Sequence, residues 1–194
     1  MTEPGPDFEV RSSRSVARTG FLEVMEEDVV APDGEVLTRY TVRHPGAVVI
    51  VAVDEHERVV MVRQFRSAAR GHLLEVPAGK REPDEEPEVT ARRELEEEVG
   101  LHAADLVKLS EFFNSPGFTD ELTHVYLARS LSPAASGAEL KAEERFMEVS
   151  RIALAEAEAL MATGAIRDGK SIIGLVLARR YLEGTYAGFT PGEP

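Results

Sequence analysis

Residues 47–53 are almost continuously apolar, and this run constrains the fold more than any other segment of the chain. A strand with this composition has no polar face to leave in water, so it must be covered on both sides. A polar turn follows at residues 54–57, and residues 59–65 read as a second strand. The pair therefore looks like a hairpin in the middle of a sheet.

The remaining segments predict a mixture of strands and helices. Helices are expected over three segments, residues 89–99, 154–163 and 171–183, and the first of them ends at Gly100, a typical helix cap. Further strands are expected at residues 8–12, 21–30, 36–43, 73–76, 107–113, 122–127 and 146–152. Residues 132–144 read as a polar loop, and the chain from Gly184 reads as a loose tail.

This order of elements predicts an α+β fold, in which a mixed sheet lies between helices in an α/β/α sandwich. A small N-terminal β region, residues 1–44, precedes the main domain, residues 45–184, and a tail follows at 185–194. The length of 194 residues suits one domain with an elaboration.

Composition excludes several classes of function. The chain has no cysteine, which excludes thiolate metal sites and a cysteine nucleophile. A formal net charge of −13 argues against a nucleic acid polymer as partner. No apolar run is long enough for a membrane span, and no secretory signal is evident, so we expect a cytoplasmic protein with no membrane partner.

Residues 79–101 carry the most distinctive pattern. Gly79 is followed at fixed spacings by Glu85, Arg93-Glu94-Leu95, Glu97-Glu98 and Gly100-Leu101. Residues 81–100 hold nine acidic and three basic side chains, a local net charge of −6. On a helix, Glu94 and Glu98 lie one turn apart on the same face, and Glu97 borders that face.

Three carboxylates this close repel one another, and they occupy the end of the helix where the macrodipole disfavours negative charge. A bound Mg²⁺ or Mn²⁺ relieves both penalties, because hard oxygen ligands suit these ions rather than zinc. Arg93 can hold Glu97, four residues on, in position, and the Ala78 carbonyl beside Gly79 is a further candidate ligand. The competing interpretation is a solvated, salt-bridged helix face.

The nine specified positions match the Nudix box, so the chain resembles the Nudix hydrolase superfamily. The resemblance implies a loop-helix-loop on an α/β/α sandwich, which binds Mg²⁺ and supports attack by water on a nucleoside diphosphate linked to another group, X. It also implies that Glu94 and Glu98 are the principal metal ligands, with Glu97 and the Ala78 carbonyl assisting. Arg93 resembles the residue that orients the glutamates.

Two further segments resemble the ADP-ribose pyrophosphatase subgroup. Pro116 lies sixteen residues after Gly100, as in that subgroup, where the equivalent of Glu121 contacts the substrate ribose. Arg66 resembles an arginine that the subgroup places on the substrate phosphates. The competing interpretations are an ordinary Ser-Pro-Gly turn and a surface arginine on an edge strand.

The subgroup also supplies a catalytic glutamate from a loop after the box. Residues 142–149 fit this place, and Glu143 aligns best as the base that takes a proton from the attacking water. Arg145 stands where the family often has another acidic residue, so Glu144 stays an alternative. A solvated loop glutamate is the competing interpretation.

These resemblances predict Mg²⁺-dependent hydrolysis of a nucleoside diphosphate linked to X, foremost ADP-ribose to AMP and ribose 5-phosphate. The alternatives are another sugar nucleotide such as GDP-mannose, a dinucleotide, or a non-catalytic nucleotide-sensing module. Such a sensor is expected to have lost a box glutamate, and this chain keeps them all. Residues 8–44 resemble a segment through which subgroup members dimerise and complete a substrate pocket, so we expect a homodimer.

Overall fold

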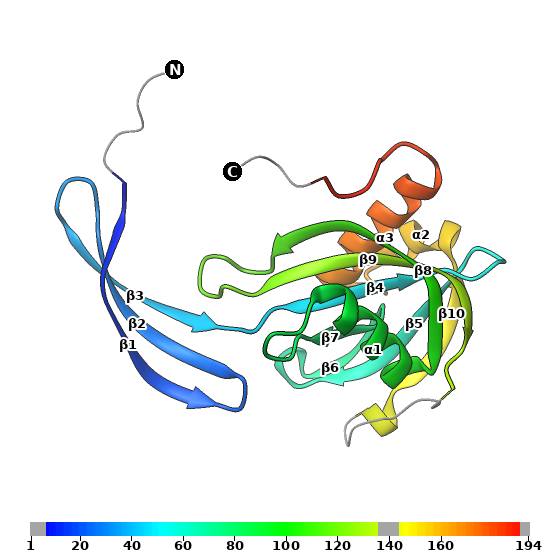
Figure 1. Cartoon of the computed structure of the whole chain (residues 1–194), viewed down its shortest axis with the longest axis horizontal. Coiled ribbons are helices and arrows are strands. Elements are labelled where there is room, and N and C mark those ends of the chain that lie inside the picture. The colour runs from blue at the N-terminus through cyan, green and yellow to red at the C-terminus, as the bar shows by residue number, and fades with distance from the viewer. Residues whose placement is uncertain (1–6, 136–143, 191–194) are drawn as a thin grey trace. The chain divides into compact units, whose positions relative to one another are not determined.

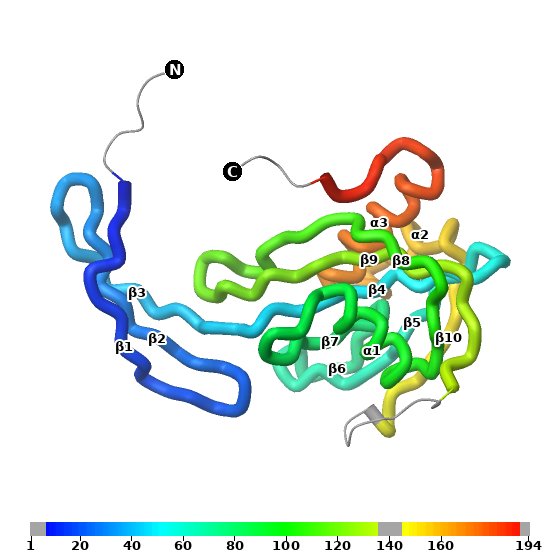
Figure 2. Tube along the Cα trace, viewed as in Figure 1, coloured from blue at the N-terminus to red at the C-terminus, as the bar shows by residue number. Residues whose placement is uncertain are grey.

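The computed structural model describes residues 7–135 and 144–190 of the chain. Two compact units make up the chain, drawn in Figures 1 and 2. The first comprises residues 1–46 and 113–122, and the second comprises residues 47–112 and 123–194. The division falls close to the boundary predicted after residue 44, but the segment 113–122 groups with the N-terminal region.

The first unit contains an antiparallel sheet of β1 (Glu9–Thr19), β2 (Leu22–Val30) and β3 (Val36–Arg43), with β2 in the centre. Every residue of β1 is exposed, so hydrogen bonds and ion pairs between strands hold it rather than apolar burial. Glu27 on β2 is 5% exposed and accepts hydrogen bonds from Ser13, Thr41 and Arg43. The three predicted strands are confirmed, and β1 is longer than expected.

The segment 113–122 joins this unit because it is bonded to the end of β3. Val42 donates its N–H to the carbonyl of Phe118 over 2.7 Å, and Asp120 donates back to the carbonyl of Val42 over 3.2 Å. The Asp120 carboxylate accepts hydrogen bonds from the Arg43 guanidinium, at 3.0 Å, and from the His44 backbone N–H, at 2.8 Å. These tertiary bonds fix the segment on the N-terminal sheet.

The second unit is organised around β4 (Ala47–Ala52), which is buried along its whole length as predicted. β4 pairs in parallel with β9 (Leu122–Pro133) and antiparallel with β7 (Ala78–Lys80). The sheet order is β7-β4-β9-β8, with β8 spanning Leu101–Phe113. The short strand β7 was not predicted.

The two faces of β4 belong to different hydrophobic cores. Val49 and Val51 pack with residues of α3 (Gly169–Leu182) and of η3 and α2 (Leu154–Glu156 and Ala157–Ala162). Val48 and Ile50 pack on the other face with α1 (Pro87–Val99). Helices therefore cover both sides of the strand, and the predicted α+β sandwich with a mixed sheet is confirmed (Figure 1).

A second sheet holds β10 (Glu148–Ala153), β5 (Arg58–Arg66) and β6 (Gly71–Glu75), in the order β10-β5-β6. The predicted central hairpin is therefore wrong, because β4 and β5 lie in different sheets and meet at the bridge between Val53 and Val59. Asp54 stabilises the turn between them by accepting hydrogen bonds from the backbone N–H groups of His56 and Arg58. Beyond this bridge the two strands separate, and β4 pairs with β7 and β9 while β5 pairs with β10 and β6.

The chain after α3 is bonded to β8 at Tyr186 and Phe189, so the prediction of a loose tail from Gly184 is wrong for these residues. The Tyr186 hydroxyl donates to the carbonyl of Leu109, and the Phe189 N–H donates to that of Lys108 over 3.1 Å. The Lys108 ammonium also lies 4.1 Å from the centre of the Phe189 ring. Across the described residues, no helix has the length and apolar character needed to cross a membrane.

The contact of α3 with β4 depends on Gly174. A Cβ added there would come within 2.9 Å of the Val51 side chain, whereas one added at Gly169 on the same helix would have nothing within 4 Å. We expect Gly174→Ala to lower the free energy of unfolding by about 1–3 kcal/mol relative to Gly169→Ala, because overpacking displaces neighbours. Urea denaturation of both variants measures the difference, and equal stabilities would contradict this packing.

Candidate active site

Helix α1 brings Glu94 and Glu98 onto one face, and both side chains are buried, at 3% and 5% exposed. The helix begins with Pro87 and ends at Gly100, whose φ of 65° is the predicted left-handed cap. Glu97 borders the same face and is partly buried. A solvated helix face leaves its carboxylates in water, so that interpretation is wrong for Glu94 and Glu98.

Glu94 lies directly against the backbone of Gly79 in β7. A Cβ on Gly79 would come within 2.0 Å of the Glu94 Cδ atom and 2.3 Å of its Oε1 atom. Only glycine leaves room for the carboxylate at this point. The first position of the motif is therefore glycine because a helix side chain occupies the space that a larger residue would fill.

Glu98 is held by the backbone of Ala78, whose N–H donates to Glu98 Oε2 over 3.1 Å. In the antiparallel ladder, Ile50 donates its N–H to the carbonyl of Pro77, so the next pair, Ala78 and Val49, makes no ladder bonds. The N–H and carbonyl of Ala78 therefore both point away from β4, on the side where Glu98 lies. This is the carbonyl that the sequence predicts as a metal ligand.

Arg93 connects the carboxylates of the motif. Its Nε and Nη2 atoms each donate to Glu85 over 2.9 Å, and Nη1 donates to Glu94 over 2.7 Å. The predicted contact with Glu97, one turn along, is present at 3.3 Å. Thr90 donates a further hydrogen bond to Glu85 over 2.8 Å. Arg93 thus links Glu85 to Glu94 and Glu97 by hydrogen bonds.

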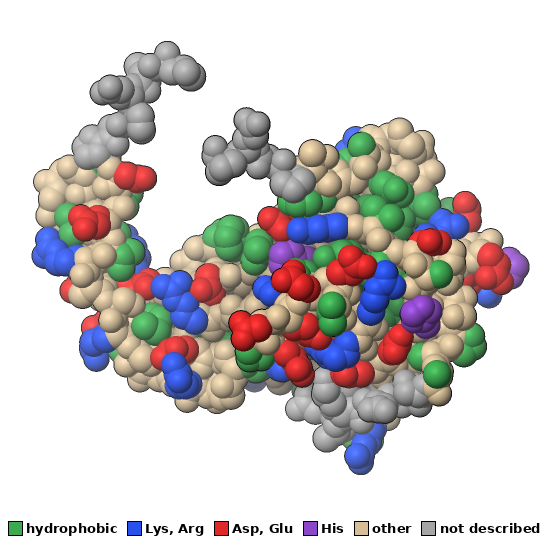
Figure 3. Space-filling model, in the orientation of Figure 1, with side chains coloured by type: hydrophobic (Ala, Val, Ile, Leu, Met, Phe, Trp, Pro, Cys, Tyr) green, Lys and Arg blue, Asp and Glu red, His purple; other side chains and the backbone are tan. Residues whose placement is uncertain are grey.

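The electrostatics of this group follow from its hydrogen bonds. The bonds from Arg93 lower the pKa of Glu85 from 4.5 to about 2, although its burial acts in the opposite direction. The same bonds, with those to Glu94, raise the pKa of Arg93. Acidic side chains gather with basic ones on the surface around α1 (Figure 3). The arginine offsets part of the negative charge that the motif concentrates there.

The donors of this site are suited to a hard divalent cation. Glu94, Glu97, Glu98 and the Ala78 carbonyl offer oxygen atoms only, and oxygen ligands are those that Mg²⁺ and Mn²⁺ prefer. Within residues 7–135 and 144–190, no group of three His, Cys, Asp or Glu side chains is already arranged around one metal position. Arg93 instead engages Glu94 and Glu97, so binding a cation requires these carboxylates to share their oxygens with it.

Comparison with known proteins identifies the family. A family model described as NUDIX domain matches residues 42–175. The chain belongs to the NUDIX domain family. An ADP-ribose pyrophosphatase of Bacillus subtilis (strain 168) is 43% identical over 150 residues, covering 77% of this chain and 80% of that protein.

Two further matches are a second relative in sequence and a solved structure. A GDP-mannose pyrophosphatase of Citrobacter koseri is 36% identical over 137 residues, which cover 68% of this chain and 71% of that protein. A crystal structure of ADP compounds hydrolase has a TM-score of 0.82 and 22% identity, and the match covers 94% of this chain and 98% of that one. The second match confirms the Nudix fold.

Arg66, predicted to contact substrate phosphates, is the last residue of β5. It belongs to the second unit, which also contains the Nudix box. Its Nε and Nη2 atoms donate to the carboxylate of Glu75 over 2.9 and 2.6 Å. The Arg66 side chain is 39% exposed, whereas that of Glu75 is 1% exposed. Arg66 is therefore not a freely solvated surface arginine.

Pro116 and Glu121 lie in the first unit, on the segment bonded to β3. The Ser115 carbonyl accepts hydrogen bonds from residues 118 and 119, so Pro116 does occupy a turn. The Glu121 carbonyl closes the segment by accepting from Asn114 over 3.0 Å. Pro116 also borders a pocket of about 290 Å³, whose other lining residues are Thr41, Arg43, Phe113, Thr119 and Asp120.

The sequence predicts no role for two glutamates, Glu75 and Glu85. Glu85 is a specified position of the box, and its spacing from Arg93 was the available signal. Glu75 ends an apolar strand, and only its pairing in the fold distinguishes it from other acids. The predicted base, Glu143, lies outside the described residues.

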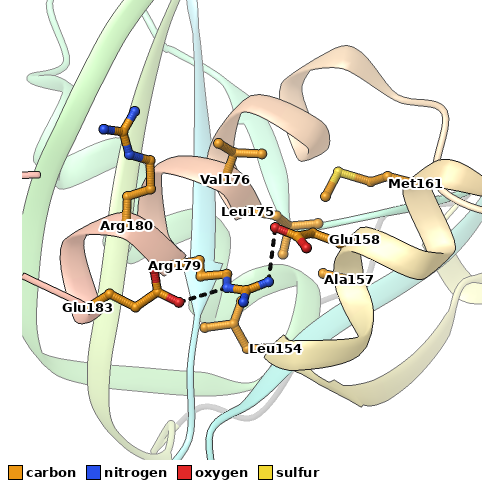
Figure 4. Close-up of a pocket in the computed structure, with 9 residues that line it drawn as sticks. All are labelled: Leu154, Ala157, Glu158, Met161, Leu175, Val176, Arg179, Arg180 and Glu183. Atoms are coloured by element: carbon orange, nitrogen blue, oxygen red, sulfur yellow. Dashed lines mark hydrogen bonds and ion pairs between the residues drawn. The ribbon is translucent and has the colours of Figure 1, made fainter. Parts of the chain in front are cut away.

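A separate cavity of about 170 Å³ lies between α2 and α3 (Figure 4). Apolar and charged side chains line it, and Arg179 pairs with Glu158 on the facing helix and with Glu183 one turn further along the chain, each over 2.9 Å. Leu175, which lines it, belongs to the core on the α3 face of β4, opposite α1. This cavity is not the site built by the Nudix box.

The Glu85–Arg93 pair makes stability depend on pH. Because the pKa of Glu85 is lowered to about 2 in the folded state, its contribution is present above pH 4.5 and lost as pH falls toward 2. The shift corresponds to about 3 kcal/mol. We expect urea denaturation between pH 5 and pH 2.5 to show a smaller acid-induced loss in Glu85→Gln than in the wild type. Parallel pH profiles would contradict this assignment.

Proposed function

We propose that this Nudix chain hydrolyses the pyrophosphate bond of a nucleoside diphosphate linked to X, with ADP-ribose, split into AMP and ribose 5-phosphate, as its main substrate. The burial of Glu94 and Glu98 beside Ala78 carries the proposal. Burying two carboxylates on one helix face is unfavourable. A site for a divalent cation explains why two carboxylates are buried together at this point.

Glu94 and Glu98 are proposed as the principal ligands of Mg²⁺, or of Mn²⁺ as a substitute, with Glu97 and the Ala78 carbonyl assisting. When bound, the cation neutralises charge on the pyrophosphate and makes water more acidic. Arg93 holds Glu94 and Glu97 in place through the bonds of 2.7 and 3.3 Å.

The other proposed roles belong to substrate and proton. Arg66 donates hydrogen bonds to the substrate phosphates, and Glu121 and Pro116 contribute to recognition of the ribose end. Glu143 takes the proton from the attacking water, with Glu144 as the alternative base. Support for these roles comes from the motifs that carry them and, for Arg66, from its hydrogen bonds to Glu75 and its electrostatic interaction with Glu98 of the box.

The substrate is proposed from the relatives. The ADP-ribose pyrophosphatase is more similar to this chain, at 43% identity, than the GDP-mannose pyrophosphatase, at 36%. Another sugar nucleotide or a dinucleotide is the alternative substrate. A non-catalytic sensor is disfavoured because the chain keeps every glutamate of the box. The homodimer, supported by the exposed strand β1, and the cytoplasmic location stay predictions.

A substrate panel tests the proposal directly. Purified protein is incubated with ADP-ribose, GDP-mannose, NADH or diadenosine compounds, with Mg²⁺ or with a chelator, and the products are separated by chromatography. We expect ADP-ribose to be cleaved faster than the other compounds. Its products, AMP and ribose 5-phosphate, should form only when the cation is present. Faster cleavage of GDP-mannose would move the assignment to the alternative, and no cleavage of any compound would refute the hydrolase.

A matched pair of substitutions on α1 tests the ligand assignment. Glu98→Gln keeps the shape and an acceptor for the Ala78 N–H but removes a charged ligand. Loss of an outer-shell partner typically costs about 10–100-fold, so losing a ligand should lower kcat by more than about 100-fold. Glu96→Gln, on a partly exposed glutamate paired with His102, should leave kcat near the wild-type value. Circular dichroism checks that both variants fold, and near-wild-type turnover of Glu98→Gln contradicts the assignment.

A further inference from the structure

Glu75 is a carboxylate buried at the end of an edge strand of the β10-β5-β6 sheet, with 1% of its surface exposed. A charge in this position requires a partner, and Arg66 supplies it through two hydrogen bonds of 2.9 and 2.6 Å. The pairing is bidentate, which fixes the plane of the guanidinium as well as its distance. Neither residue's partner was evident from the sequence.

The pair leaves part of the arginine available for other contacts. Nε and Nη2 face the carboxylate, so the remaining N–H groups of the planar guanidinium point away from Glu75. The Arg66 side chain is 39% exposed, while Glu75 is enclosed. The hydrogen bonds to Glu75 raise the pKa of Arg66 most, and the charge of Glu98 in the Nudix box also raises it, so the guanidinium lies within electrostatic range of that glutamate.

The backbone around Glu75 is bonded both to β5 and to the start of α3. Val62 on β5 pairs with Glu75 in the antiparallel ladder. The next residue, Val76, donates its N–H to the Ser171 hydroxyl over 3.0 Å, and that hydroxyl donates to Asp168 over 2.8 Å. Asp168 is also the N-cap of α3. The backbone that carries Glu75 is therefore anchored to a helix end and to the sheet, as a fixed support requires.

Stability alone is a poor explanation for this pair. A buried ion pair is often no more stabilising than apolar residues of similar volume, because both charges lose their hydration. Here the carboxylate is fully enclosed but the guanidinium is not. That asymmetry fixes the buried partner and leaves N–H groups of the exposed one accessible to a ligand.

We propose that Glu75 is a positioning residue, which orients the N–H groups of Arg66 toward the phosphates of the nucleoside diphosphate substrate. This rests on the proposed function. Charge and orientation predict opposite effects of removing the carboxylate. Glu75→Gln leaves Arg66 with more net positive charge, which would strengthen binding of an anion if charge alone mattered. Loss of orientation weakens binding instead.

The test compares KM and kcat for the best substrate of the panel in Glu75→Gln, Arg66→Ala and the double variant. We expect KM to rise about 10-fold or more in Glu75→Gln, the scale of a lost hydrogen bond to a charged group, with a smaller change in kcat. The double variant should be no worse than Arg66→Ala, because Glu75 acts only through Arg66. An unchanged or lower KM in Glu75→Gln, or additive effects, would overturn the proposal.

Asp54→Asn is the matched control, because Asp54 is also a buried carboxylate that accepts a hydrogen bond from an arginine, Arg58, over 2.9 Å. It should lose stability without a change in KM, and an equal rise in KM would show a merely structural effect. If Glu75→Gln does not fold, Glu75→Asp keeps the charge and shortens the side chain, so a raised KM still supports orientation and an unchanged KM overturns it. Failure of the wild type on the whole panel refutes the proposed function and is a distinct outcome.

Discussion

Two carboxylates are buried where α1 meets β7, and the geometry of the site follows from satisfying them. Glu94 receives its hydrogen bond from Arg93, and Glu98 receives one from the Ala78 backbone. The second bond exists because β7 is an edge strand whose outer N–H and carbonyl groups face the helix. The motif therefore depends on the sheet order, and not only on the spacing of residues along α1.

The same contact holds β7 against α1. Gly79 leaves the space that Glu94 fills, so a side chain there would displace the Glu94 carboxylate from its place against the strand. The apolar side of α1 packs through Leu95 on the α1 face of β4. Burial of Leu95 stabilises the helix, and that stability offsets the desolvation of the acids beside it.

Much of this fold was predictable where the signal is local. The apolar run that became β4 and the glycine that ends α1 were both evident from the sequence, since composition and a left-handed cap decide them. Strand β7 was missed because three residues carry no period, and its partner β4 is far away in the chain. The loop held by Asp120 and the tail held by Tyr186 depend on tertiary hydrogen bonds that no local pattern encodes.

The candidate site divides in the same way. The face shared by Glu94 and Glu98, and the contact of Arg93 with Glu97, follow from helical spacing and were predicted. The hydrogen bonds between Arg93 and Glu85 were missed, because Glu85 lies in the loop before the helix. The burial of Glu94 and Glu98, which rules out a solvated helix face, could not be predicted from the sequence and is seen only in the structure.

A chain with a net charge of −13 that acts on a pyrophosphate needs a local source of attraction. Arg66 and Arg93 do not supply it as net charge, because Glu75 faces the first and Glu85, Glu94 and Glu97 face the second. These pairings instead fix orientation. Glu75 holds the N–H groups of Arg66, and Arg93 holds the carboxylates of Glu94 and Glu97. Attraction for the anionic substrate is then left to a divalent cation, which explains why the acids beside β7 are kept although they repel the substrate themselves.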